Sequence, residues 1–282
     1  MDVHFQLDRD LNIQSADCSQ TSEDQWLIDV SISDQWQVIV GPNGGYLGAL
    51  LLAGVKTVNP LGLQFVRSVA VNFISPSVPG PAQLSIQCIK QGRTTSLFQS
   101  KLNQGNRNIA QATVTLASDR LPISFCDPTM PQIPAADTLK PMNWSRTNSD
   151  FAVPFRGHYD QRVGLGPIPG EKDDSGRIGG WMRFKDLRPI DDLGLLAMSD
   201  GWYPSVISRN LPQAVHVPSL DHTLHFLCSD FSSFDPHAFV GFEFVTEIAA
   251  AGYLIEDGKM FSESGQLLAI SRQMAAMVPF EV

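Results

Sequence analysis

Apolar and polar residues alternate over several long stretches of the chain, which is the pattern of β-strands with one buried face. In the first part of the sequence, this alternation predicts strands within residues 3–40 and over 67–75, 82–90, 94–103 and 109–117. It returns later over 179–187, 219–227, 240–248, 252–261 and 265–273. We therefore expect sheet to make up most of the fold.

Two segments replace this alternation with apolar residues at helical spacing. The first opens with GPNGG at residues 41–45 and continues with recurring leucines. The second, DLGLLAMSDGWYPSVIS, covers residues 192–208, and Asp191 and Asp192 are its candidate N-cap residues. Both helices are apolar nearly all round, so we expect each of them to lie buried against sheet.

The order of strands, one buried helix and a meander of strands occurs twice, in copies of about 120 residues. Between the copies, prolines are frequent and neither the strand period nor the helix period persists, which is typical of a connecting segment. We predict a first domain over residues 1–120, a linker over 121–153 and a second domain over 154–282.

Three polar residues of the second copy lie on predicted strands where the pattern does not require them. These are Asp221, Thr246 and Gln273. When the two copies are laid on one another, the first copy shows no equivalent Asp-Thr-Gln set. The polarity is therefore not demanded by the fold, and a functional site built from these residues would belong to the second copy.

Sequence motifs in both halves resemble the acyl-CoA thioesterase II family, whose TesB-like members carry two hotdog folds in one chain. The motifs are GPNGGYLGALLLAG in the first half, and SLDHTLHF and GQLLAISRQ in the second. The resemblance implies an α+β fold of two tandem hotdog domains, each an antiparallel sheet wrapped round a long buried helix. It also implies hydrolysis of an acyl-CoA to the free acid and CoA, without a metal, a cofactor or a covalent intermediate.

The resemblance assigns roles to the three polar residues. In that family an Asp, a Thr or Ser, and a Gln on the strands after the second helix hold and activate the hydrolytic water, and Asp221, Thr246 and Gln273 are matched to them. A carboxylate can accept the proton of the water, so Asp221 is predicted to be the base. Thr246 and Gln273 are too weakly basic for that role and are predicted to position the water.

Two glycines of the first half are the candidate substrate-binding residues. Backbone N–H groups at the start of a helix, here from Gly44 and Gly45, can face an acyl carbonyl or a CoA phosphate. The alternative is that the glycines only let the helix start pack against sheet. GPNGG also stands where relatives often have His-Gly-Gly, so the role of that histidine has no counterpart here.

Asp200 is the alternative base, because a carboxylate within the helix is the catalytic group of some other hotdog thioesterases. Its other interpretation is an exposed helix turn ahead of Gly201. His222 and His225 point to opposite faces of a strand, which argues against a metal pair, and His222 is predicted to be a core histidine. Surface arginines and lysines are the candidates for binding CoA phosphates: Arg93, Lys101, Arg107 and Arg272.

Two other functions stay open at this point. One is an acyl-CoA or acyl-chain binding protein that kept the pocket and lost the chemistry. The other is an enoyl-CoA hydratase on the same fold, although its G-D-x-N-P-x-H type of motif does not occur in the sequence. The two functions differ from hydrolysis in an assay of free thiol release.

Composition narrows the class of partner. The net charge of −9 argues against broad nucleic-acid binding, because no basic stripe is available to neutralise phosphates. The four cysteines are scattered, which favours reduced thiols and a cytoplasmic protein. The sequence has no secretion signal and no apolar run of 18 residues, so no membrane partner is expected. A homodimer through sheet edges is the preferred assembly, and a monomer stays open.

Overall fold

The computed structural model describes residues 5–14, 17–59, 65–121, 123–144 and 153–280. Its main feature is a 12-stranded antiparallel sheet in the order β1-β2-β4-β5-β6-β3-β10-β13-β12-β11-β8-β7. The strands of the first half are β1 (Cys18–Ser22), β2 (Gln25–Ile32), β3 (Phe65–Phe73), β4 (Gly80–Gln91), β5 (Thr95–Gln104) and β6 (Arg107–Ala117). Those of the second half are β7 (Tyr159–Leu165), β8 (Arg177–Phe184), β10 (Ser219–Phe226), β11 (Val240–Ala250), β12 (Tyr253–Ser262) and β13 (Leu267–Ala276).

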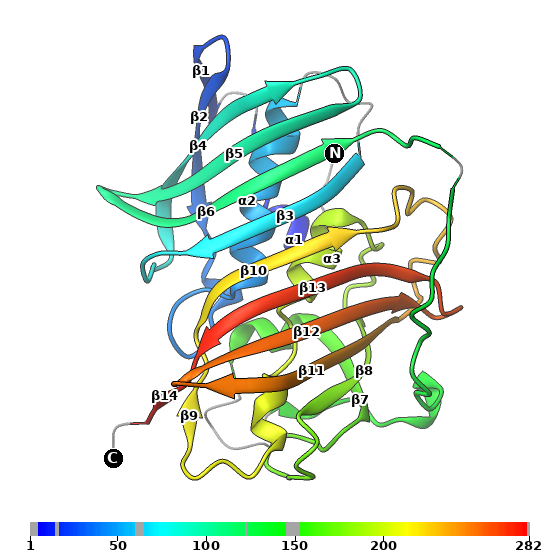
Figure 1. The fold of residues 1–282 in the computed structure, drawn as a ribbon. Helices are drawn as coiled ribbons and strands as arrows, with labels where there is room; N and C mark the ends of the chain where they lie inside the picture. Colours follow the sequence, from blue (N-terminus) through cyan, green and yellow to red (C-terminus); the bar gives the residue numbers. More distant parts are fainter. Residues whose placement is uncertain (1–4, 15–16, 60–64, 122, 145–152, 281–282) are drawn as a thin grey trace.

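The two halves of the sheet have the same internal order. Reading outward from the centre, β3, β6, β5, β4, β2 and β1 are matched by β10, β13, β12, β11, β8 and β7. The halves join where β3 and β10 pair antiparallel, with Val69 opposite Leu224. Figure 1 shows this continuous sheet, with the chain between the halves running along one side of it. The predicted architectural repeat is therefore present in the fold.

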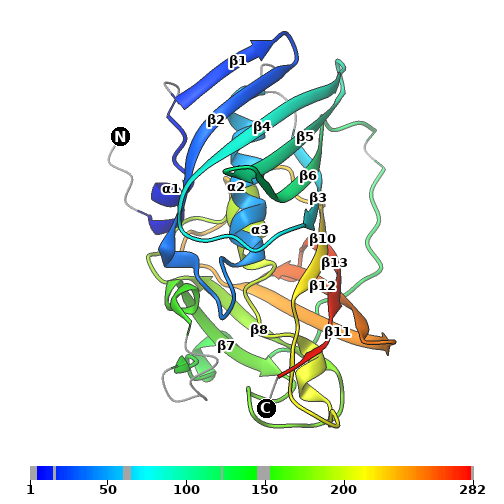
Figure 2. The same ribbon diagram turned by 90° about the vertical axis from the view of Figure 1, so that its left-hand side faces the viewer.

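Three α-helices of the described residues accompany the sheet: α1 (Gln6–Asp10), α2 (Gly44–Val58) and α3 (Asp192–Met198). The sheet curves around α2 and α3, as the turned view in Figure 2 shows. Most of α2 is buried, including Leu50, Leu51 and Leu52, which are at most 1% exposed. Because α2 is apolar on nearly every face, it can fill the concave side of its half and still pack against α3.

Short 3-10 helices and one small ribbon complete the described part of the chain. The 3-10 helices are η2 (Asp34–Trp36), η3 (Ala136–Thr138), η6 (Pro154–His158) and η7 (Ser205–Ser208). The ribbon pairs β9 (Val215–His216) with β14 (Val278–Pro279). Within the described part of the predicted linker, regular structure is limited to 3-10 conformation, as in η3, in agreement with a segment that has no regular period.

The structure corrects three expectations drawn from the alternation pattern. Residues 6–10 form a helix, not a strand, because that conformation buries Leu7 and Leu11 together on one face. The residues between the predicted linker and the strand predicted over 179–187, for which no strand was predicted, contribute edge strand β7. The second helix ends at Met198, ten residues earlier than predicted, and Pro204, which has no N–H to donate, opens the separate helix η7.

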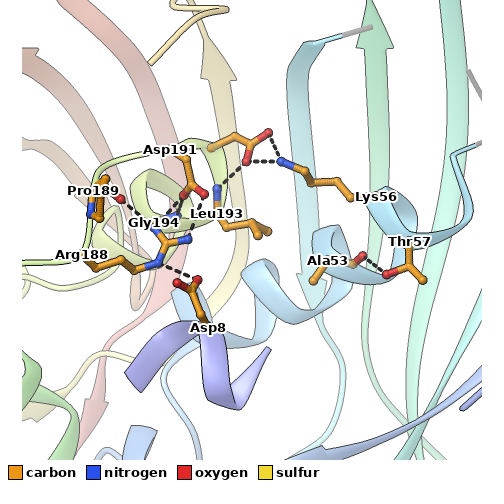
Figure 3. Close-up of polar contacts among 10 residues, drawn as sticks. Asp8, Ala53, Lys56, Thr57, Arg188, Pro189, Asp191, Leu193 and Gly194 are labelled. Carbon is orange, nitrogen blue, oxygen red and sulfur yellow. Dashed lines mark hydrogen bonds and ion pairs between the residues drawn. The ribbon is translucent and has the colours of Figure 1, made fainter. Parts of the chain in front are cut away.

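The start of α3 is closed by charged side chains, as Figure 3 shows. The Asp191 carboxylate caps the helix by accepting from the Gly194 N–H at 2.7 Å. The Arg188 guanidinium is 4% exposed and donates to both Asp191 oxygens at 2.8 Å and to Asp8 at 2.8 Å. Beside them Lys56, near the end of α2, pairs with Asp192 at 2.6 Å. This end of the helix pair is thus filled by an ion-pair network.

Candidate active site

The start of α2 holds an aspartate that comes from just beyond α3. Asn43 caps α2, since its side-chain oxygen accepts from the Tyr46 N–H at 3.0 Å. Its Nδ2 donates to Asp200 Oδ2 at 2.9 Å and to the Asp200 carbonyl at 2.8 Å. The Gly45 N–H donates to the same Oδ2 at 3.1 Å. The positive end of the α2 dipole therefore faces the Asp200 carboxylate.

Glycine is required at this helix start because two backbones meet there. A Cβ on Gly45 would lie 2.5 Å from the Ala197 carbonyl oxygen, and a Cβ on Gly44 would lie 2.7 Å from the Phe73 ring. The close approach of α2 to α3 is what brings Asp200 within hydrogen-bonding distance of the Gly45 N–H. The expectation that Asp200 lies on an exposed helix turn is therefore wrong.

The surroundings of Asp200 favour its neutral form more than water would. Burial raises the pKa of Asp200 to about 6, and the Gly45 N–H opposes this shift. The nearby Glu256 carboxylate raises the pKa further, whereas the Arg156 guanidinium lowers it. A carboxyl group with this pKa can both take up and give back a proton near neutral pH, as a general base must.

Asp200 lines a small pocket of about 40 Å³. The pocket is lined by Ser199, Asp200, Trp202, Pro204, Val217, Ser219, Phe244, Glu256 and Gln273. A water molecule needs roughly 10–15 Å³ of such volume and two to four polar partners. The pocket meets both conditions, because the polar residues Asp200, Ser219 and Gln273 all line it.

Ser219 is turned into this pocket by an irregularity in β10. The pairing of β10 with β13 shifts between Ser219 and Asp221, so Leu220 is an extra residue in the strand. Such a bulge re-aims the side chains on either side of it. Strict alternation would place Ser219 and Asp221 on the same face, but the Ser219 hydroxyl lies 3.2 Å from Gln273 Oε1.

Gln273 lies on the inner face of β13, where it was predicted to line the site. It is 9% exposed, and its Nε2 donates to Glu256 Oε1 on β12 at 2.7 Å. On its other side it is opposite His222 of β10. Gln273 thus occupies the centre of a row of inward polar side chains that crosses three neighbouring strands.

Thr246 is part of the same polar network but lies behind the pocket. It is 1% exposed, and its hydroxyl contacts Ser205 Oγ at 2.7 Å. Ser205 in turn donates to the Glu256 carboxylate from its N–H and its hydroxyl. Thr246 is therefore linked to Gln273 through two intervening side chains, and it does not line the pocket.

The structure does not bring Asp221 together with Gln273 and Thr246. Asp221 alternates with the buried His222, and its cross-strand partners Asn72 and Met274 are both exposed. Its Oδ1 accepts from the Met274 N–H at 3.0 Å. Asp221 thus lies on the outer face of the sheet, with its carboxylate used to satisfy the backbone at the bulge.

His222 is a buried core histidine, as predicted. Burial lowers its pKa to about 4, and a contact with the Gln273 side chain offsets part of that shift. Its Nε2 lies 2.7 Å from Ser199 Oγ. The residues that the structure describes contain no cluster of His, Cys, Asp or Glu that could hold a metal ion.

A larger pocket of about 470 Å³ lies in the first half, next to α1 and β2. Its lining includes Asp10, Ile32 and Leu50 but none of the polar residues described above. We therefore place the chemistry in the smaller pocket. Of the candidates for binding CoA phosphates, Arg272 is paired with Asp257 at 2.6 Å on the outer face.

Comparison with known families identifies the chain. The model of an acyl-CoA thioesterase N-terminal domain matches residues 32–117, and that of an acyl-CoA thioesterase C-terminal domain matches residues 128–277. The chain belongs to the acyl-CoA thioesterase family. The prediction of a TesB-like thioesterase is thereby confirmed, and this thioesterase carries one family domain in each half of its sheet.

Solved structures show that this thioesterase has the hotdog fold. A conserved protein of unknown function with a hot dog fold from Alicyclobacillus acidocaldarius is 21% identical, with a TM-score of 0.83 over 98% of both chains. A putative thioesterase II from Thermobifida fusca YX is 19% identical, with a TM-score of 0.77 over 98% of this chain and 99% of that one. The acyl-CoA thioesterase II TesB2 from Mycobacterium marinum is 20% identical, with a TM-score of 0.71 and the same coverage.

These comparisons confirm the predicted fold class of two tandem hotdog folds. A search of curated protein sequences finds no match to this thioesterase. None of the helices in the described ranges is long and apolar enough to cross a membrane.

Proposed function

We propose that this thioesterase hydrolyses an acyl-CoA by direct attack of water, with Asp200 as the base and Ser219 and Gln273 as the positioning residues. The proposal rests on one observation: these three residues, from the turn after α3, from β10 and from β13, line a single pocket with room for a water molecule. Asp200 here takes the role that the sequence assigned to Asp221, and Ser219 takes the role assigned to Thr246.

The reaction proceeds through a tetrahedral intermediate. The water oxygen attacks the thioester carbon while one water proton passes to Asp200. When the intermediate collapses, the carbon–sulfur bond breaks and Asp200 returns the proton to the departing CoA thiolate. The products are a carboxylic acid and CoA. The Asp200 carboxyl group accepts the proton in the first step and returns it in the second, so neither a metal nor a covalent enzyme intermediate is required.

Gly44 and Gly45 support this chemistry from the start of α2. The Gly45 N–H holds Asp200, and the helix dipole favours negative charge at the same point. We propose that this field stabilises both the ionised base and the oxyanion that forms next to it. The role of the two glycines in substrate binding is then indirect, since their lack of a side chain allows α2 to pack closely against α3 and so shapes the pocket.

Thiol release from a panel of acyl-CoAs is the primary test. Hydrolysis of at least one acyl-CoA, measured as free CoA appearing with time, is the expected result. Binding of acyl-CoA without thiol release would instead identify an acyl-CoA binding protein. The family match favours hydrolysis over the hydratase alternative. A cytoplasmic location and a homodimer through the edge strands β1 and β7 stay predictions.

The pH dependence of turnover should report the ionisation of Asp200. The base must be ionised to accept a proton, and the pKa of Asp200 is raised to about 6. We therefore expect kcat/KM to be low below pH 5 and to rise to a plateau above pH 7. Initial rates between pH 4.5 and 8 measure this, and a profile that is flat across that range would exclude Asp200 as the base.

Replacement of Ser219 by alanine should weaken the positioning of the water. The variant removes a hydroxyl that contacts Gln273 Oε1 in the pocket. Loss of one hydrogen bond of about 1.4 kcal/mol lowers kcat about tenfold. The Ser219→Thr variant keeps the hydroxyl and should retain most of the wild-type kcat. Equal rates for the alanine variant and the wild type would remove Ser219 from the site.

A further inference from the structure

Glu256 is a buried carboxylate that lines the pocket and has no part in the proposed reaction. It lies on β12, opposite Gln273 on β13, and is 4% exposed. Its Oε1 accepts from Gln273 Nε2 at 2.7 Å. Its Oε2 accepts from the Ser205 N–H and from the Ser205 hydroxyl, both at 2.6 Å. Both carboxylate oxygens are thus held by donors.

Ser205 links Glu256 to Thr246. Because the Ser205 hydroxyl donates to Glu256, its oxygen is left to accept from Thr246, 2.7 Å away. Burial raises the pKa of Glu256, while the donors from Ser205 and Gln273 oppose that shift. The Glu256 carboxylate therefore accepts hydrogen bonds from Ser205 on one oxygen and from Gln273 on the other.

This arrangement determines the orientation of the Gln273 amide. An ionised carboxylate can only accept hydrogen bonds, so it binds the NH₂ end of the amide. The carbonyl Oε1 is then directed to the other side, where the Ser219 hydroxyl lies 3.2 Å away. The acceptor Glu256 and the donor Ser219 thus agree on the position of the amide oxygen.

We propose that Glu256 is a positioning residue that presents the Gln273 carbonyl oxygen to the hydrolytic water. This inference rests on the proposed function of the pocket. With Gln273 Oε1 and Asp200 both accepting, the water gives one hydrogen to each and keeps a lone pair directed at the thioester carbon. With the amide reversed, the NH₂ group would instead occupy that lone pair, and the water would be a poorer nucleophile.

Replacement of Glu256 by glutamine tests the proposal without changing the size of the side chain. The Ser205 donors hold the new amide by its oxygen, so its NH₂ group faces Gln273. Gln273 must then reverse to accept from it, and presents NH₂ to the pocket. We expect kcat to fall by about 10- to 100-fold with KM within about twofold of wild type, the result of losing one well-placed interaction or two. The unfolding temperature should not fall, because a buried charge has been removed.

The swapped double variant Glu256→Gln/Gln273→Glu is the rescue. The new amide at position 256 donates to the new carboxylate at position 273, which again presents an oxygen to the pocket, so kcat should recover at least about fivefold over the single variant. Glu243→Gln is the matched control: Glu243 is also a buried glutamate, but it pairs with Arg177 and Lys259 away from the pocket. Its kcat should equal that of the wild type.

Hydrogen exchange of the Gln273 side-chain NH₂ group gives a readout that is independent of turnover. The signal of this group is assigned as the one that is missing in the Gln273→Leu variant. Slow exchange in the wild type and fast exchange in Glu256→Gln are expected. A wild type without thioesterase activity but with this exchange difference would contradict the proposed function and leave the amide orientation supported. Wild-type kcat in Glu256→Gln, a double variant no faster than the single one, or equal exchange in both proteins would overturn the proposal.

Discussion

The Asp200→Asn variant is expected to lower kcat for acyl-CoA hydrolysis by about 10²- to 10⁴-fold, the range that general-base catalysis contributes. Asparagine keeps the size of the side chain, and its oxygen can still accept from Asn43 and from the Gly45 N–H. It cannot take a proton from water near neutral pH. Stopped or continuous thiol assays under saturating acyl-CoA measure the loss, and a decrease of less than about threefold would exclude Asp200 as the base.

The same variant should not lose stability, which separates catalytic loss from misfolding. The pKa of Asp200 is about 6 in the fold, above its ordinary value, so the protonated form is the one the fold favours. The stability that this carboxyl contributes is present below its unfolded pKa and is lost as pH rises through 6. We expect Asp200→Asn to unfold at a higher temperature than wild type at pH 8, and the gap to shrink by pH 4.5. A lower unfolding temperature at pH 8 would contradict this account.

Arg188→Met is expected to reduce the free energy of unfolding by about 1–3 kcal/mol, less than the roughly 3–5 kcal/mol for a fully buried ion pair, because the partner side chains Asp191 and Asp8 are 38% and 33% exposed. Arg188 is nearly inaccessible and pairs with Asp191 and Asp8. Its loss leaves the partly exposed Asp191 carboxylate with the Gly194 N–H but without the Arg188 cation. Urea unfolding measures the difference.

The nearby pair of Lys56 and Asp192 provides the control for this prediction. Lys56 is 40% exposed, so its ion pair is screened by solvent. Lys56→Met should cost less than about 1 kcal/mol. If the two variants lost equal stability, the burial of Arg188 would not be the source of its effect.

The predictions for Asp200 and for Arg188 concern opposite ends of the antiparallel pair formed by α2 and α3. At the start of α3, Arg188 and Lys56 neutralise the aspartates and fill the junction (Figure 3). At the start of α2, Asp200 faces backbone N–H groups and a pocket. The fold repeats, but the carboxylates at the start of α3 are ion-paired, whereas the carboxylate at the start of α2 lines a pocket. We propose one reactive centre per chain on the basis of that difference.

The sequence was sufficient for the fold because alternation and helical spacing are local signals. The predicted strand over 240–248 corresponds to β11 at Val240–Ala250, and GPNGG marks the start of α2. For these elements, periodicity and turn residues carried the information. Gln273, which the resemblance assigned to the site, lines the pocket.

The rest of the site could not be predicted because it depends on departures from local pattern. The bulge at Leu220 turns Ser219 inward and leaves Asp221 outside, which reverses the expectation from alternation. The early end of α3 allows Asp200 to meet the start of α2, a contact across 155 residues of sequence. Both effects are set by tertiary pairing. A serine two positions before Asp221 was visible in the sequence, but nothing local distinguished it.

The most direct test of the account compares Asp200→Asn with Asp221→Asn in the same thiol-release assay. The two variants make the same chemical change, one at the pocket and one on the outer face of the sheet. We expect kcat/KM to fall by at least about 100-fold for Asp200→Asn, and to stay within about twofold of wild type for Asp221→Asn. The reverse result, with activity lost only at Asp221, would contradict the placement of the reaction in this pocket.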